Sequence, residues 1–171
     1  MRGFVQVYTG NGKGKTTAAM GLVLRAAGAG LSAFVAQFAK DGTSSEILGL
    51  KRFSDRVSVE AYGTGRFIGQ TPAPEEIAAA QRGLDRVRRV LGTGRHDLVV
   101  IDEGCTAVRF GLFTVEELMA VIDRKPETTE LVVTGRGAPP ELIARADLVT
   151  EMREIKHYYH QGVGARRGIE Q

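Results

Sequence analysis

The residues with the clearest chemical role lie in a glycine- and lysine-rich stretch near the N-terminus, TGNGKGKTT at residues 9–17. Its last part, Gly14-Lys15-Thr16, matches the end of the phosphate-binding pattern G-x-x-x-x-G-K-[ST]. In that pattern backbone N–H groups and the lysine contact phosphate oxygens, and the hydroxyl ligates Mg²⁺. The first glycine is displaced, because Thr9 stands in its place and glycine follows at Gly10. The stretch predicts a triphosphate-binding loop with an unusual beginning.

A second candidate is the acid pair Asp102-Glu103, which follows the apolar run LVVI. An acid at the end of a buried strand holds Mg²⁺, directly or through water, in P-loop proteins. The alternative is a surface acid pair that caps the next helix. In many P-loop ATPases an acid at this place polarises water, so the two motifs by themselves also permit an ATPase.

Three further features carry less weight. Arg136, in TGRG after an expected strand, can clamp a phosphate through its guanidinium, or it is an ordinary surface arginine. Cys105 has no evident base beside it and is better explained as a small buried residue than as a nucleophile. His157 and His160 have an i, i+3 spacing that could hold a metal, but two histidines alone favour surface or lid residues.

These residues need strands and helices that bring them to one place. Residues 4–8 read as a strand and 15–29 as a helix, which is the context that a phosphate loop requires. The apolar spacing predicts further strands at 33–38, 57–62, 97–102, 130–134 and 147–152, and helices at 45–53, 75–91, 114–123 and 139–146. Thr114 and Glu117 form a capping box at the start of the helix at 114–123.

Strands that alternate with helices predict an α/β fold with a P-loop NTPase-like (RecA-like), mostly parallel sheet and helices on both faces. Ligands bind such sheets at the carboxyl ends of the strands. The glycine-rich loop and Asp102-Glu103 both follow strands, so we expect them to meet at that edge.

Length and composition bound the remaining possibilities. The 171 residues fit one domain, residues 1–171, large enough to bury its own core. A net charge of +3 and a pI near 9.2 suit an anionic ligand but are too weak to indicate nucleic acid. No apolar run approaches the roughly 20 residues that span a membrane, and MRGFVQVYTG reads as a strand rather than a signal peptide. The single cysteine favours a reducing compartment, so we expect a cytoplasmic protein.

Several stretches occur together in one order: TGNGKGKTTAA, VAQFAKDG, GTGRF, LVVIDEG, VVTGRG, LIARADLVTEM and KHYYHQGVGARRGIE. In these stretches, from Val5 to Glu170, the chain resembles the P-loop corrinoid adenosyltransferases (ATP:cob(I)alamin adenosyltransferases) of cobalamin synthesis and salvage. The resemblance implies transfer of the 5′-deoxyadenosyl group of ATP to the Co(I) centre of a reduced corrinoid, with release of triphosphate. The corrinoid would be cobalamin or a precursor such as a cobyrinic acid diamide. The family holds ATP in the reverse sense to other P-loop proteins, and the displaced glycine is a hypothetical sign of that seating.

The resemblance also assigns roles to residues of this chain. It implies that Lys15 and Glu103 are catalytic, and that the metal, Mg²⁺ or Mn²⁺ in its place, is held by Thr16, Asp102 and Glu103. The nucleotide and corrinoid contacts that it implies are Thr9, Gly10, Asn11, Gly12, Lys13, Gly14, Lys15, Thr16, Thr17, Arg136 and Phe67. No protein acid or base is required, because cobalt is the nucleophile.

Two departures from the family pattern concern the cover of the site and the corrin face. Family members commonly have a helical extension before the first strand, so here its cover is expected to be missing or supplied otherwise. After GTG the family often places two aromatics at i and i+2, which hold the corrin face apolar. This sequence reads Arg66-Phe67-Ile68, with one shifted aromatic and Ile68 where a tryptophan often stands.

The resemblance further implies a homodimer and a reductant or flavoprotein that reduces Co(II), with no membrane or nucleic-acid partner. One alternative is a P-loop ATPase or small-molecule kinase, which would release ADP. Another is a nucleotide-gated binding module for nucleic acid that uses the arginine-rich helix and binds polyanions in a strongly salt-dependent way. The arginines of that helix are better explained as a solvated face; they are Arg82, Arg86, Arg88 and Arg89.

Overall fold

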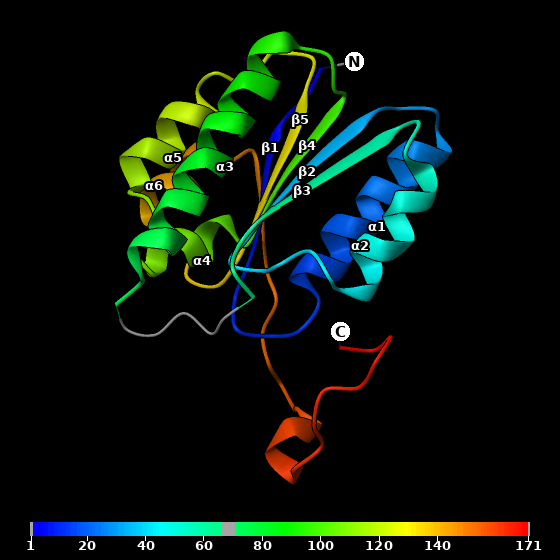
Figure 1. The fold of residues 1–171 in the computed structure, drawn as a ribbon, viewed down its shortest axis with the longest axis vertical. Coiled ribbons are helices and arrows are strands. Elements are labelled where there is room, and N and C mark those ends of the chain that lie inside the picture. Colours follow the sequence, from blue (N-terminus) through cyan, green and yellow to red (C-terminus); the bar gives the residue numbers. More distant parts are fainter. Residues whose placement is uncertain (1, 66–70, 171) are drawn as a thin grey trace.

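The computed structural model describes residues 2–65 and 71–170 and shows a parallel sheet between two layers of helices (Figure 1). The strands are β1 (Val5–Thr9), β2 (Ala33–Phe38), β3 (Val57–Tyr62), β4 (Leu98–Asp102), β5 (Glu130–Thr134) and β6 (Leu148–Glu151). The helices are α1 (Lys15–Gly28), α2 (Ser45–Leu50), α3 (Pro74–Thr93), α4 (Gly104–Arg109), α5 (Val115–Ile122) and α6 (Pro140–Arg145). Short 3₁₀ turns cover Lys51–Phe53 and Tyr158–Gln161.

The strand order, β3-β2-β4-β5-β1-β6, places β5 between β1 and β4. Each pair of neighbours is parallel, so all carboxyl ends of the strands lie at one edge. The register pairs Gln37 of β2 with Asp102 of β4 at that edge. The α/β class and the parallel sheet that the sequence predicts are therefore confirmed, and the loops after β1 and β4 share one side of the molecule.

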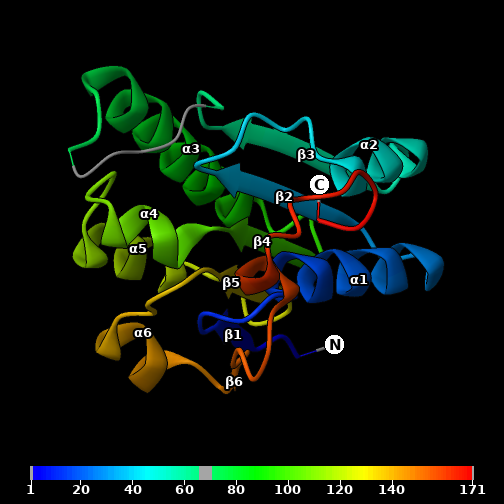
Figure 2. The same cartoon turned by 90° about the horizontal axis from the view of Figure 1, so that it is seen from below.

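Helices α1 and α2 cover one face of the sheet, and α3 to α6 cover the other (Figure 2). Side chains alternate between two buried clusters along β4, with Val99 and Ile101 on the α3–α6 side and Leu98 and Val100 on the α1–α2 side. A strand that is buried on both faces needs no polar positions. This burial explains why the run before Asp102 and Glu103 is entirely apolar.

The structure also shows how local sequence sets the ends of the elements. The capping box is confirmed, because the N–H of Glu117 donates to Thr114 Oγ1 at 3.2 Å and Thr114 N–H donates to the Glu117 carboxylate at 2.7 Å. The helix expected at 45–53 divides into α2 and a 3₁₀ turn. No expected range covers α4, a six-residue helix that begins at Gly104 and is separated from the end of β4 by Glu103 alone.

Two arginines of the arginine-rich helix α3 form ion pairs within the protein. Arg86 binds the Glu60 carboxylate at 2.9 Å, and Arg88 binds Asp85 at 2.6 Å. Both arginine side chains remain partly exposed, which agrees with the expectation of a solvated face. No helix in the described part of the chain combines the length and the apolar character needed to cross a membrane.

Gly83 lets α3 approach the sheet closely, and we expect Gly83→Ala to destabilise the protein. A Cβ there would lie 2.6 Å from the Tyr62 ring and 2.7 Å from the Phe38 ring. Overpacking of this kind costs about 1–3 kcal/mol, which should lower the melting temperature by a few degrees. Gly92→Ala in the same helix is the matched control: a Cβ there meets nothing within 4 Å, so the change should be neutral or stabilising by up to about 1 kcal/mol.

Candidate active site

The glycine-rich loop joins β1 to α1 and takes its shape from a close approach of the chain after β6. Gly10 has a φ of 96°, and a Cβ there would lie 2.4 Å from the Met152 carbonyl oxygen. The N–H of Gly12 donates to that same oxygen at 2.7 Å. Thr9 is still part of β1, and its hydroxyl accepts a hydrogen bond from the Ala138 N–H at 3.1 Å. Packing against Met152 therefore requires glycine at position 10. This requirement does not depend on the orientation in which the nucleotide binds.

Lys15 is the first residue of α1, and its ammonium turns back into the loop. The side chain donates to the Gly12 carbonyl at 2.7 Å, and the residue is only 7% exposed. Burial, and then the positive charge of Arg136, lower the pKa of Lys15. The ammonium thus lies at a poorly solvated position near the start of α1. A bound anion would stabilise its charge there.

Asp102 ends β4 and anchors three polar side chains from three elements. Its carboxylate is fully buried, and one oxygen accepts hydrogen bonds from Thr16 at 2.8 Å and Thr134 at 2.7 Å. The other oxygen accepts from Gln37 Nε2 at 3.0 Å. The contact with Thr16 joins the loop to the end of β4, as the two motifs predict.

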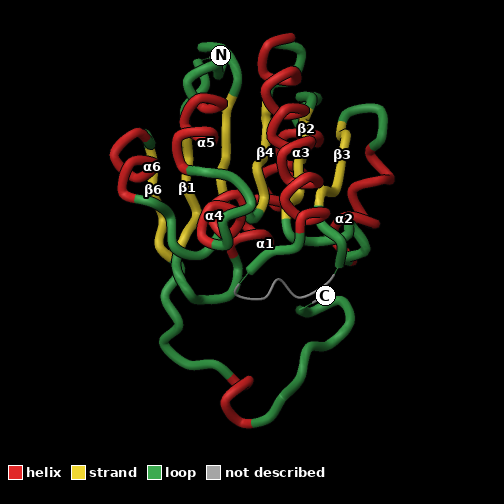
Figure 3. The backbone as a smooth tube through the Cα atoms, turned by 60° about the vertical axis from the view of Figure 1, so that its left-hand side comes forward, coloured by secondary structure: helices red, strands yellow, loops and turns green. Residues whose placement is uncertain are grey.

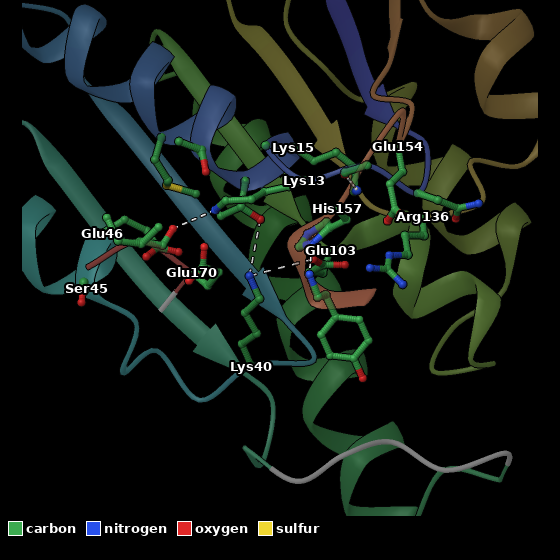
Figure 4. Close-up of a pocket in the computed structure, with 18 of the residues that line it drawn as sticks. Lys13, Lys15, Lys40, Ser45, Glu46, Glu103, Arg136, Glu154, His157 and Glu170 are labelled. Carbon is green, nitrogen blue, oxygen red and sulfur yellow. Dashed lines mark hydrogen bonds and ion pairs between the residues drawn. The ribbon is translucent and has the colours of Figure 1, made fainter. Parts of the chain in front are cut away.

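Glu103 stands in the turn between β4 and α4. Its φ of 59° is unusual for a residue with a side chain, and its N–H donates to Thr134 Oγ1 at 2.9 Å. The carboxylate accepts a short hydrogen bond from Thr106. The Glu103 side chain lines the pocket beside the loop (Figure 4). Glu103 also occupies the N-cap position of α4, but its side chain makes no capping hydrogen bond. The alternative of an acid that caps the next helix therefore holds for its position and not for its carboxylate.

The acids and the threonine suit a magnesium ion better than a metal with nitrogen or sulfur ligands. Within residues 2–65 and 71–170 no three His, Cys, Asp or Glu side chains gather in a way that could hold a metal. Mg²⁺ needs fewer protein ligands, because it binds one or two carboxylates and takes oxygens from water and substrate phosphates. Gln37 Oε1, on the amide that contacts Asp102, is buried and has no hydrogen-bond partner among the described residues. The residues present therefore fit such an ion.

The loop, Glu103 and Arg136 line one pocket of about 860 Å³ (Figure 4). The lining includes most of the residues expected to bind nucleotide: Asn11, Gly12, Lys13, Gly14, Lys15, Thr16, Thr17 and Arg136. Thr9, Gly10 and Asp102 are not in its wall, and Thr9 and Asp102 are buried at the ends of β1 and β4. Phe67 lies outside the described residues. Arg136 thus lines the same pocket as the loop.

The C-terminal segment forms another wall of this pocket, which the sequence did not predict. It leaves β6, passes below the carboxyl edge of the sheet and returns toward α1 and α2 (Figure 3). Lys13 donates to the Ile169 carbonyl at 2.7 Å, which ties the segment to the loop. Glu170 binds Arg166 and the Tyr158 hydroxyl, and these hydrogen bonds lower the pKa of Glu170 to about 2.

The two histidines of this segment do not form a metal site. His157 lines the pocket, whereas His160 contacts Glu154 at 2.6 Å. Their ring centroids are 6.4 Å apart, with the planes inclined at 77°. These positions agree with the expectation of surface or lid residues.

Two further residues beside Asp102 were not predicted, and they come from β2 and the residues that follow it. Gln37 is fully buried in an otherwise apolar strand and holds Asp102. Lys40 lines the pocket and lies 3.6 Å from Asp102 and 3.9 Å from Glu103. The available signal was a lysine just after a buried strand, at the edge where ligands of parallel sheets bind.

Cys105 belongs to α4 and is fully buried in the hydrophobic core. We expect its thiol to be inert in the folded protein. Burial, and then the negative charge of Glu103, raise the pKa of Cys105 to about 12. A thiol reagent at pH 8 should leave the native protein unmodified and label it fully in denaturant. Because the thiol is easier to ionise when unfolded, its contribution to stability is present below pH of about 8.5 and is lost as the pH rises toward 12. Cys105→Ala should remove that alkaline component, and rapid labelling of native protein would contradict the assignment.

At the carboxyl edge of the parallel sheet, a glycine-rich loop joins a strand to a helix, and an acidic residue ends a nearby strand. This arrangement defines an α/β protein with a P-loop NTPase-like fold. Residues 1–171 match the family described as ATP:corrinoid adenosyltransferase BtuR/CobO/CobP, and the chain belongs to that family. It is 37% identical over 170 residues to a corrinoid adenosyltransferase of Pseudomonas aeruginosa, covering 99% of this chain and 84% of the relative. It is also 35% identical to the Escherichia coli K12 corrinoid adenosyltransferase and to corrinoid adenosyltransferase CobA of Salmonella typhimurium, covering 99% of this chain and 86% of each relative.

Proposed function

We propose that this protein transfers the 5′-deoxyadenosyl group of ATP to the Co(I) centre of a reduced corrinoid and releases triphosphate. A cobalt–carbon bond forms at C5′ while the bond from C5′ to the α-phosphate oxygen breaks, and the bonding electrons leave on triphosphate. The observation that carries the proposal is the family match over residues 1–171, which includes both the loop and the C-terminal segment that meet in one pocket.

The loop and its cations would hold the leaving group. Negative charge develops on the oxygen that leaves C5′, so donors fixed in advance at that place lower the barrier. Lys15 and the backbone N–H groups at the start of α1 are such donors, and Arg136 adds a second cation to the same pocket. Lys15 would exchange its contact with Gly12 for phosphate oxygens.

Thr16, Asp102 and Glu103 would hold Mg²⁺, or Mn²⁺ in its place. The bound ion would neutralise charge on the departing triphosphate as a Lewis acid. Asp102 has a second task, because its contacts with Thr16, Thr134 and Gln37 fix the start of α1 against β4 and β5. A general acid or base is not needed, and the chain's contribution would be positioning and electrostatic stabilisation.

We place the corrinoid beside Lys40, on the side away from α1. A second pocket of about 560 Å³ adjoins the first there and is lined by residues of the β2–α2 loop together with Gly65 and Arg167. Phe67 follows Gly65 closely in sequence and would supply an apolar contact for the corrin. Arg167 comes from the C-terminal segment, which therefore borders both pockets.

The setting of the reaction completes the proposal. We infer a cytoplasmic protein that works as a homodimer and receives Co(I) from a reductant or flavoprotein. The homodimer and the reductant follow from the family, the cytoplasmic setting follows from the single cysteine, and size measurements in solution test the dimer directly.

The test is an anaerobic assay with Mg·ATP and chemically reduced cob(I)alamin. We expect a light-sensitive cobalt–carbon product, followed by absorbance, together with one equivalent of intact triphosphate. Release of ADP and phosphate that does not depend on corrinoid would instead support the ATPase or kinase. A mixture without corrinoid and a mixture without divalent cation are the controls.

A further inference from the structure

The ammonium of Lys40 lies among the residues that would hold the metal, and Figure 4 shows it directed toward Glu103. Its nitrogen is 3.4 Å from Thr16 Oγ1, 3.6 Å from an Asp102 oxygen and 3.9 Å from a Glu103 oxygen. All three groups are the oxygen ligands assigned to Mg²⁺. A cation of this protein thus stands beside the proposed cation site.

The backbone directs Lys40 to this place. Ala39, just before it, has a φ of 57°, which only a close-fitting environment makes an alanine adopt. Gly63 supplies that environment, because a Cβ there would lie 2.3 Å from the Lys40 backbone nitrogen. The turn after β2 therefore points the side chain back over the ends of β2 and β4.

The contacts of Lys40 are close enough for charge pairing but loose enough to be exchanged. The distances to both carboxylates exceed those of a charge-assisted hydrogen bond, which are about 2.7–2.9 Å. The side chain is also 35% exposed, whereas Asp102 is fully buried. Gln37 Oε1, buried and unpaired within the described residues, adds an oxygen that a lysine at this distance does not satisfy.

We propose that Lys40 is an internal counter-ion that neutralises the proposed metal ligands and opposes metal binding until nucleotide arrives. When a triphosphate enters, its oxygens offer Lys40 a new partner, and the carboxylates become free for the divalent ion. Lys40 then holds the leaving group from the side opposite Arg136. This inference rests on the metal site proposed above, and it adds a positioning residue that lies outside both sequence motifs.

The first test measures Mn²⁺ binding to the protein without nucleotide, using the electron paramagnetic resonance signal of free Mn²⁺. Lys40→Met should bind Mn²⁺ about tenfold more tightly than the unchanged protein, because one like charge is removed from a partly exposed site. Lys40→Arg should not. Lys51→Met is the matched control, since Lys51 is an exposed lysine in a separate 3₁₀ turn and its removal changes net charge equally. Equal Mn²⁺ affinity in Lys40→Met and Lys51→Met would overturn the inference.

A second measurement tests the exchange of partners. In calorimetry with tripolyphosphate and Mg²⁺, Lys40→Met should lose about tenfold in affinity, and Lys51→Met should lose none. If the mutant binds tripolyphosphate as well as the unchanged protein does, Lys40 is only a structural ion pair. Thermal melting shows that each variant is folded, and Lys40→Gln provides a second neutral variant. Neither binding measurement needs corrinoid, so a failure here is distinct from a failure of adenosyl transfer.

Discussion

Lys15→Ala should lower the rate of adenosyl transfer by about 100- to 1000-fold, the usual loss when a preorganised donor to a developing anion is removed. The effect should fall mainly on kcat, because the charge on the leaving oxygen is greatest in the transition state. The measurement is the initial rate of cobalt–carbon bond formation at saturating ATP and corrinoid. Lys51→Ala, in an exposed 3₁₀ turn, is the control and should retain full activity.

The loss in Lys15→Ala should not come from unfolding. Burial lowers the pKa of Lys15, so the folded protein holds this proton less tightly than the unfolded chain does. The charged form therefore weakens the folded state at neutral pH, and this penalty fades as the pH rises from the lowered pKa toward about 10.4. The melting temperature of Lys15→Ala should equal or exceed that of the unchanged protein. A large fall in melting temperature, or retained kcat, would contradict the assigned role.

Asp102→Asn should abolish most of the metal-dependent activity while it preserves the fold. Removing the buried negative charge weakens the metal site, and we expect a loss of about 100-fold or more in kcat. The neighbouring Gln37 can accommodate the change, because its amide can turn so that the unpaired Oε1 accepts from the new Asn amide. The rate should be measured over a range of Mg²⁺ concentrations, and the melting temperature should change little.

Asp102→Ala provides the contrast that separates charge from structure. It would leave the donors of Thr16, Thr134 and Gln37 without their acceptor in a buried site. At about 1 kcal/mol or more for each such group, the total should reach roughly 3 kcal/mol and lower the melting temperature by about 6–12 °C. Asp85→Asn, which removes an exposed carboxylate paired with Arg88, should change stability by less than about 1 kcal/mol. If Asp102→Asn were as unstable as Asp102→Ala, the turn of Gln37 would be wrong.

Much of the fold could be predicted because it depends on local pattern. The apolar run before Asp102 predicts a strand buried on both faces, and β4 is such a strand. Thr114 and Glu117 predict the start of α5 from a capping box that acts within four residues. The short helix α4 was missed, although the equally short α6 was predicted from the prolines at its start.

Some residues of the candidate site could likewise be predicted from sequence motifs, and others only from tertiary contacts. Lys15, Thr16 and Glu103 were predicted from motifs, whose chemistry follows from residue type and spacing, and all three line the pocket. Gln37 and Lys40 were missed because nothing close to them in sequence reveals their partners. The contact of Gln37 with Asp102 arises from the parallel register of β2 and β4, which joins residues 65 positions apart.

The sequence by itself determined that this protein is an α/β protein with a phosphate loop, an acid strand end and the motifs of one enzyme family. Those properties reside in short stretches, where the identity and spacing of residues fix the backbone and the available chemistry. Only the tertiary structure decided that Gly10 is required by the Met152 carbonyl, that the C-terminal segment borders the pocket at Lys13, and that Lys40 lies beside Asp102 and Glu103. Each of these contacts joins segments far apart in the chain, so each depends on how the strands pair and not on any local pattern.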